Sequence, residues 1–308
     1  MTTLRYEDIV KIVQSEVPSL SEIKNITKLN GGLTNVNFRI DTSQESYVVR
    51  VSEPSSNTLG INRDNEYINS KRAHEAGLGA EVIHRIIDKN MLIIKWIEAK
   101  TLHPDDIINQ PSLIPRITNA LKLLHAGPSF QGEFNFPVIR KKYLEIVTRS
   151  GYFIPDQYLE LLPLIENLEQ AIASTPEKKV PCNNDLLAEN LMDDGNKIWI
   201  IDYEYAGQNE ASFEIGNFAH EVGLSDKQLT ELCAAYWGQN DTYKFARAKA
   251  WSIVARYGWV LWASIQDANS SIFFDFKTWG LKKWDSVLPE IQGKVYTEIL
   301  KNLNKFNA

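Results

Sequence analysis

The chain has 308 residues, of which 44% are hydrophobic and 23% charged, a composition typical of folded globular proteins and not of disordered or fibrous ones. Its 39 acidic residues outnumber 33 basic ones, which argues against nucleic-acid binding, and two cysteines are too few for a disulfide framework. No apolar run reaches the roughly 18–20 residues that cross a bilayer, and the polar N-terminus is unlike a signal peptide. We therefore expect a cytoplasmic protein without a membrane span.

The first hundred residues predict an antiparallel β-sheet with one helix. Short runs rich in β-branched residues are separated by turn-forming segments at Asn30–Gly32 and Asp88–Asn90. A helix with charges of both signs is expected from about Asn62 to Ala76, where Gly77 ends it. The strands are expected at Ile23–Leu29, Val36–Ile40, Tyr47–Val51, Val82–Ile87 and Met91–Trp96.

After Trp96 the periodicity becomes that of long helices, interrupted by one predicted hairpin of Leu191–Met192 with Lys197–Asp202. We expect an α+β fold with an N-terminal lobe at residues 1–97, a C-terminal lobe at residues 98–308 and a cleft between them. The helices are expected at Ser112–His125, Arg140–Ser150, Pro155–Ser174, Asp226–Trp237, Tyr243–Ala268 and Thr278–Asn304.

A glycine turn lies between the first two predicted strands, at Gly31 and Gly32, and is followed by Thr34 and Asn35. Glycines let the backbone approach a ligand closely and leave amide groups free to donate to phosphate oxygens. An ordinary hairpin turn would explain the glycines alone. The polar side chains of Thr34 and Asn35 favour a ligand.

Arg50 lies at the end of an apolar strand, and Glu66 lies in the helix that follows. A cation held on a sheet by a helix carboxylate can contact the α- and β-phosphates of a nucleotide. A solvated surface ion pair is the alternative.

Three oxygen-bearing side chains cluster around the predicted hairpin. Asp185 and Asn190 share one loop, and Asp202 ends the apolar strand Ile198–Ile201. One carboxylate can accept a hydroxyl proton, while the amide oxygen and the second carboxylate suit Mg²⁺. Turn capping would explain Asp185 alone, but it explains the spaced set poorly.

In the order of these motifs the chain resembles the choline/ethanolamine kinase family, within the aminoglycoside-phosphotransferase branch of the protein-kinase-like fold. The resemblance covers nearly the whole chain, and several spaced motifs are more specific than any one of them. The matching segments are Gly31–Asn35, Arg50, Asn62-Arg63 with Glu66, Asn183–Asn190 and Ile201–Tyr205.

The resemblance implies a bilobal kinase-like fold and a function for each motif. Asp185 would orient or deprotonate the acceptor hydroxyl, Asn190 and Asp202 would bind Mg²⁺, and Arg50, held by Glu66, would contact the phosphates of ATP. ATP would lie beneath the Gly31–Asn35 loop. Its adenine would lie against a hinge near Lys95–Glu98, which includes Trp96.

One residue departs from the family pattern, because Asn183 stands where the catalytic loop normally begins with His. In the family that His is thought to brace the loop, and Asn also offers a donor and an acceptor. The substitution keeps open a catalytically degenerate protein that only binds nucleotide or amine.

Six of the eight tryptophans fall between Trp237 and Trp284. Helical spacing alone favours a core role, whereas an aromatic cage would bind a quaternary ammonium group, which has no hydrogen-bond donors. The resemblance favours the cage, although its last position is usually Tyr in the family. The implied acceptor-binding residues are Tyr205, Glu221, Trp259, Trp262, Phe274 and Trp279.

The expected activity is therefore transfer of the γ-phosphoryl group of ATP, with Mg²⁺, to the hydroxyl of choline or a related cationic amino-alcohol. Ethanolamine, an amino sugar or an aminoglycoside is the alternative acceptor within the same fold. We interpret His125, His220 and Cys182 as structural residues.

Overall fold

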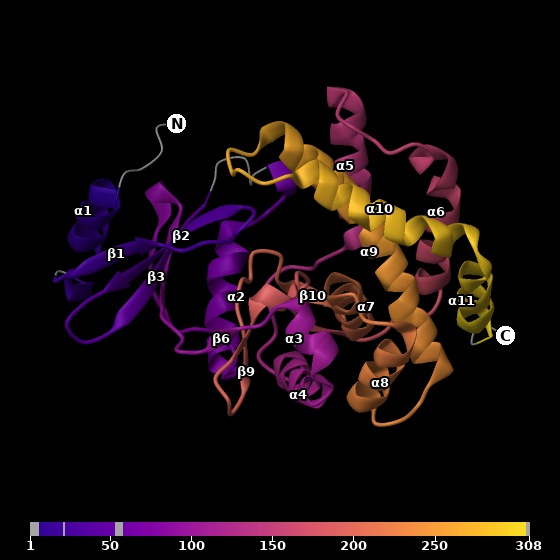
Figure 1. Cartoon of the computed structure of the whole chain (residues 1–308), viewed down its shortest axis with the longest axis horizontal. Helices are drawn as coiled ribbons and strands as arrows, with labels where there is room; N and C mark the ends of the chain where they lie inside the picture. The colour runs from indigo at the N-terminus through magenta and orange to yellow at the C-terminus, as the bar shows by residue number, and fades with distance from the viewer. Residues whose placement is uncertain (1–5, 21, 53–57, 306–308) are drawn as a thin grey trace.

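Alternating apolar residues build a five-stranded antiparallel sheet at one end of the molecule (Figure 1). The computed structural model describes residues 6–20, 22–52 and 58–305. All five predicted strands are present, and β5 lies between β3 and β4. The strands are β1 (Asn25–Lys28), β2 (Asn35–Asp41), β3 (Ser46–Ser52), β4 (Val82–Ile86) and β5 (Met91–Lys95).

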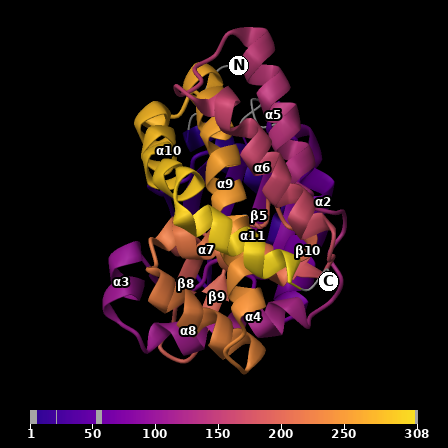
Figure 2. The same cartoon turned by 90° about the vertical axis from the view of Figure 1, so that its right-hand side faces the viewer.

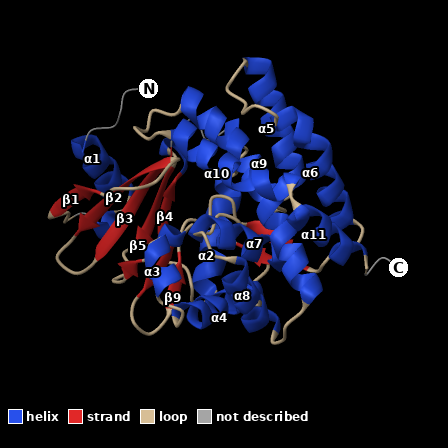
Figure 3. Ribbon diagram, turned by 45° about the vertical axis from the view of Figure 1, so that its right-hand side comes forward, coloured by secondary structure: helices blue, strands red, loops and turns tan. Residues whose placement is uncertain are grey.

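One face of this sheet packs against helix α1 (Tyr6–Glu16), which the sequence analysis did not predict (Figure 3). Ile9 and Val13 of the helix form a core with Val49 and other sheet residues. Because successive side chains of a strand point to opposite faces, Arg50 points away from this core and towards the helical part.

Helix α2 (Arg63–Glu75) joins the sheet to the rest of the molecule. Its N-cap, Asn62, accepts hydrogen bonds from two backbone amides of the first turn. Ala73, near the other end, belongs to the hydrophobic core of the helical part. Asn69 donates to the carbonyl oxygens of Gln131 and Ala206 at 3.0 and 2.9 Å. The helix is therefore shared by both parts.

The helical part surrounds α9 (Thr242–Asn269), which is buried along most of its length (Figure 2). The predicted helix Thr278–Asn304 is two helices, separated at Gly293, and helices α3 and α7 were not predicted. The remaining helices are α3 (Pro104–Asn109), α4 (Leu113–His125), α5 (Phe136–Ser150), α6 (Tyr158–Ala173), α7 (Ala211–Val222), α8 (Asp226–Trp237), α10 (Phe276–Gln292) and α11 (Lys294–Asn304).

Two small sheets hold the loops between these helices. The predicted hairpin exists as β8 (Leu191–Asp193) and β9 (Ile198–Ile200), and β6 (Lys100–Thr101) joins it. Strand β7 (Lys179–Cys182) pairs with β10 (Gly207–Glu210), an interaction the sequence did not reveal. The α+β architecture of a small antiparallel sheet and a larger helical part is confirmed. None of the helices in the described residues is long and apolar enough to span a membrane.

Candidate active site

A cavity of about 380 Å³ lies where the glycine turn of the sheet meets the helical part. Most of the residues predicted to act in binding or catalysis line it, although they come from distant parts of the chain. Asn35, Arg50, Glu66 and Trp96 do not line it. The predicted residues on its wall are Gly31, Gly32, Thr34, Asp185, Asn190, Asp202, Tyr205, Glu221, Trp259, Trp262, Phe274 and Trp279.

The loop that carries Asp185 is braced by Asn183, the residue that departs from the family pattern. The side-chain amide of Asn183 donates to the carbonyl oxygens of Ile201 and Asp202, at 3.3 and 2.7 Å. Its amide oxygen accepts the backbone N–H of Asp185 at 3.0 Å. Asn183 thus ties the loop of Asp185 to the segment of Asp202, which is the bracing function that the sequence analysis considered possible for Asn.

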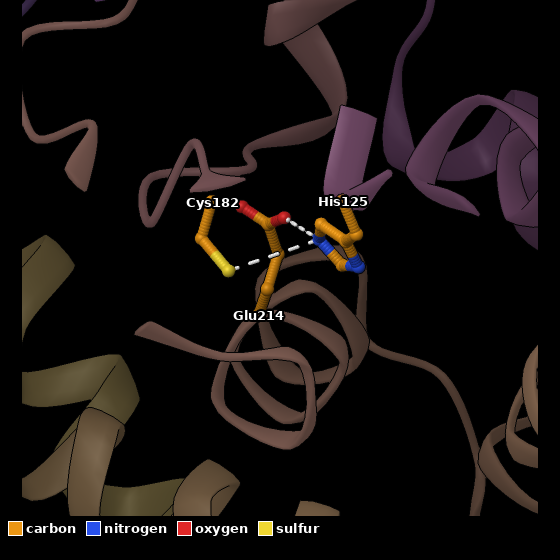
Figure 4. A group of neighbouring side chains, drawn as sticks. All are labelled: His125, Cys182 and Glu214. Carbon is orange, nitrogen blue, oxygen red and sulfur yellow. Dashed lines mark hydrogen bonds and ion pairs between the residues drawn. The ribbon is translucent and has the colours of Figure 1, made fainter. Parts of the chain in front are cut away.

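A second brace is formed by a buried cluster beneath the same loop (Figure 4). Glu214 accepts the backbone N–H of Asn184 at 2.8 Å, and its other oxygen lies 2.5 Å from Nε2 of His125. Cys182 Sγ lies 3.8 Å from the same nitrogen, and Tyr236 contacts Nδ1 of His125 at 2.7 Å. His125 and Cys182 therefore have structural roles, as predicted, and His125 acts by holding Glu214.

Two residues at these braces have left-handed backbone conformations, Asn184 with φ of 67° and Asp202 with φ of 64°. Such conformations are uncommon for residues other than glycine and persist where the surroundings enforce them. The hydrogen bonds of Asn183 and Glu214 supply that enforcement, and both strained residues lie beside the cavity.

The carboxyl group of Asp185 is half-buried in the cavity wall. Burial raises its pKa well above the usual value, and the nearby carboxylates of Asp202, Glu204 and Glu221 raise it further. Lys283 opposes them. A carboxyl group with a raised pKa holds a proton more readily, which suits a group that accepts a proton from an alcohol.

Asn190 and Asp202 lie on neighbouring segments, because the carbonyl oxygen of Asn190 accepts the backbone N–H of Ile201 at 2.9 Å. The side-chain amide of Asn190 donates to the carbonyl oxygen of Asp185 at 2.7 Å, which leaves its amide oxygen as a ligand atom. Burial raises the pKa of Asp202 to about 6 against the opposing effect of Arg50, whose Nη2 lies 2.6 Å away. An amide oxygen and a carboxylate on one cavity wall fit a hard divalent cation.

Glu204, which the sequence analysis did not single out, is the centre of the contacts between the two parts of the molecule. Its carboxylate lies 2.9 Å from Arg50 and 3.2 Å from Arg63. It accepts hydrogen bonds from Thr34 Oγ1 at 2.6 Å and from Asn35 Nδ2 at 2.9 Å. Although burial alone would raise the pKa of Glu204, these partners hold it below the usual value.

This arrangement changes the interpretation of Thr34 and Asn35. Their side chains hold the glycine turn to Glu204, and Asn35 is buried away from the cavity. Phosphate binding at this turn stays a prediction, and the backbone amides of Gly31 and Gly32 are the groups left for it. Glu204 lies two residues after Asp202 within the matching segment Ile201–Tyr205, and this proximity was the available signal.

The predicted contact between Arg50 and Glu66 is present, with 3.4 Å between Nε and Oε1, and Arg63 also contacts Glu66, at 2.7 Å. Trp96 does not line the cavity. Its ring stacks on the guanidinium group of Arg39 at 4.3 Å, and its Nε1 donates to Glu98 at 2.9 Å. Binding of adenine by Trp96 stays a prediction.

Aromatic side chains form another part of the cavity lining. The rings of Tyr205 and Trp259 are 5.6 Å apart, and the ring of Trp262 lies 6.4 Å from Trp259 and 5.4 Å from Trp279. Trp262 Nε1 donates to the Tyr205 hydroxyl at 2.9 Å. Phe274, 41% exposed, lies at the rim. Trp259 and Trp262 are also part of the hydrophobic core, which is the core role considered for them, and binding of an acceptor by these rings stays a prediction.

Comparisons with known proteins show which family the sequence resembles. The sequence model of choline/ethanolamine kinases matches residues 26–244. Protein LicA of Haemophilus influenzae is 24% identical over 82% of this chain and 97% of its own, and probable ethanolamine kinase A of Dictyostelium discoideum is 27% identical over 87% and 85%.

Solved structures are also similar. A choline/ethanolamine kinase family protein from Mesorhizobium loti has a TM-score of 0.85 and 25% identity over 97% of this chain and 99% of its own. The structure of LicA in complex with AMP has a TM-score of 0.73 and 21% identity over 93% and 98%. These likenesses confirm the predicted bilobal kinase-like fold.

Proposed function

Because the chain belongs to the choline/ethanolamine kinase family and is a small-molecule phosphotransferase, we propose a specific reaction for it. It transfers the γ-phosphoryl group of ATP to the hydroxyl of choline. More broadly, the proposed acceptors are choline and closely related cationic amino-alcohols. One observation carries the proposal. The lining of a single cavity combines carboxylate and amide oxygens suited to a metal-bound triphosphate, which we call its charged end, with a group of aromatic rings, its aromatic end, and it includes Asp185.

The charged end of the cavity would hold the nucleotide. The backbone amides of the Gly31–Gly32 turn, which lines the cavity, would donate to phosphate oxygens, and Arg50 forms ion pairs with three carboxylates. The amide oxygen of Asn190 and the carboxylate of Asp202 are the groups that would hold Mg²⁺. The ion would neutralise charge on the phosphates.

Asp185 would act on the acceptor. Its carboxylate would accept the hydrogen bond of the acceptor hydroxyl and take its proton as the oxygen attacks the γ-phosphorus. Because burial raises the pKa of Asp185, the rate should fall as the pH is lowered through that pKa and the carboxyl becomes protonated. Asn183 and Glu214 would fix its direction through the loop backbone.

The aromatic end would select the acceptor. A trimethylammonium group offers no hydrogen-bond donors, so it is recognised by ring faces. Tyr205, Trp259, Trp262 and Trp279 supply the rings. Ethanolamine is the second candidate, because the relatives of this chain include a probable ethanolamine kinase.

The test is release of ADP from ATP with choline, with ethanolamine and with the uncharged alcohol in which carbon replaces the nitrogen of choline. We expect choline to be the best acceptor and the uncharged alcohol the poorest. Asp185→Asn should lower turnover about 10²–10⁴-fold. Asp88→Asn, at a carboxylate whose side chain is 72% exposed, is the matched control. Preference for the uncharged alcohol, or full activity of D185N, would refute the proposal.

A further inference from the structure

A lysine of the protein itself contacts two of the groups that were predicted to bind the acceptor's cation. Lys283 Nζ, on α10, is 2.5 Å from a carboxylate oxygen of Glu221 and 4.0 Å from the ring centre of Trp279. Glu221 and Trp279 both line the acceptor end of the cavity, whereas Lys283 is not part of the cavity wall and is 8% exposed. The carboxylate and the ring face are thus already in contact with an ammonium group.

The charges around this pair show that Lys283 is the cation that balances Glu221. His220 Nε2 lies 3.5 Å from the other carboxylate oxygen of Glu221. Burial and nearby cations hold the pKa of His220 well below its usual value, so the imidazole is neutral and does not balance the charge of Glu221. The next cations on the surrounding helices, Arg256 and Lys249, contact Glu290 at 2.5 and 3.0 Å. Glu221 therefore offers the cavity little free negative charge.

Resting on the function proposed above, we infer that Lys283 determines which amine the cavity accepts. By neutralising Glu221 and covering one face of Trp279, it leaves an acceptor end made of ring faces without a free carboxylate. A quaternary ammonium needs no hydrogen-bond acceptor and is bound by such rings. A primary ammonium loses its hydrogen bonds to water there and finds no free carboxylate, so it is disfavoured.

The test compares the ratio of kcat/KM for choline to kcat/KM for ethanolamine in four variants. Lys283→Met frees Glu221 for the three N–H donors of ethanolamine, so the ratio should fall about tenfold or more. Lys283→Arg keeps the charge and should keep the ratio. Glu221→Gln leaves Lys283 unpaired, so KM for both cations should rise together. The double variant E221Q/K283M has neither charge and should return towards the wild-type ratio.

The ratio is measured within one protein sample, so partial unfolding of a variant cancels. A ratio unchanged within about twofold in K283M, in an enzyme that still phosphorylates choline, overturns the inference alone. A wild-type enzyme that phosphorylates neither amine overturns the proposed function, and this inference with it. If the ratio falls equally in K283R and K283M, the inference is also overturned, because the positive charge at position 283 would then not determine the choice of amine.

Discussion

The two ends of the cavity are built by different physical means. At the charged end, residues of β3, α2 and the segment after β9 meet through ion pairs that connect the sheet to the helical part, with Glu204 in contact with Arg50 and Arg63. At the aromatic end, rings of α9 and α10 pack against one another within the helical part alone. Ion pairs can exchange partners when a ligand arrives, whereas packed rings of a core stay in place.

Each end nevertheless contains a cation of the protein in contact with a carboxylate that faces the cavity. Arg50 contacts Asp202, and Lys283 contacts Glu221. Buried carboxylates without a partner are costly, which gives a physical reason for both pairs. We therefore expect the charged end to control phosphoryl transfer and metal use, and the aromatic end to control acceptor affinity.

The largest expected effect tests the charged end. Asp202→Asn removes a negative charge from the proposed metal site, so we expect turnover at fixed Mg²⁺ to fall at least about 100-fold. The Mg²⁺ concentration needed for half-maximal rate should rise, while KM for choline should change little. Titration of Mg²⁺ at saturating ATP and choline measures this, with D88N as the control. An unchanged Mg²⁺ dependence would remove Asp202 from the metal site.

The next effect tests the aromatic end. Trp279→Leu keeps an apolar side chain but removes a π-face, so KM for choline should rise about 2–30-fold. Turnover at saturating choline and the Mg²⁺ dependence should stay near wild type. Steady-state kinetics with choline and with its uncharged isostere measure the effect. Equal loss for both acceptors would mean that the ring contributes shape and not attraction to a cation.

A smaller effect distinguishes two adjacent glycines of the turn. Both have φ of 89°, so alanine is strained at either position. At Gly32 a Cβ would also lie 2.7 Å from the carbonyl oxygen of Asn35, whereas at Gly31 it would meet no atom within 4 Å. We expect KM for ATP to rise several-fold more in G32A than in G31A, measured at saturating choline. Equal effects would show that strain alone matters.

The smallest effect is on stability. The pKa of Asp185 is raised in the folded protein by burial first, so wild-type stability falls as the pH rises from about 4 through that pKa. Asp185→Asn removes the titrating group, and we expect its Tm at pH 8 to exceed that of wild type by about 2–4 °C. The difference should close as the pH approaches 4. A wild-type Tm that equals or exceeds that of D185N at pH 8 would contradict the raised pKa.

Some of what the sequence analysis missed had a readable signal. Ile9 and Val13 have the spacing of one helix face, which indicates α1, and Gly293 marks the break between α10 and α11. Trp96 stacks on Arg39, a contact that the sequence analysis did not predict, and its binding of adenine stays a prediction.

Other contacts had no readable signal, because the partners are far apart in the chain. Thr34 and Glu204 are 170 residues apart, and Lys283 and Glu221 are 62 apart. The same holds for the brace of His125 and Glu214, which are separated by 89 residues. Nothing in local periodicity indicates which buried polar group will satisfy another.

The sequence by itself determined the sheet, most of the helices, and the short motifs with Asp185, Asn190 and Asp202, because strand alternation, turn chemistry and motif spacing act over a few residues. Only the tertiary structure decided that Asn183 braces the loop, that Glu204 joins the two parts and that Lys283 neutralises Glu221. These depend on which charges and hydrogen-bonding groups become neighbours once water is excluded, and that is a property of the packed molecule.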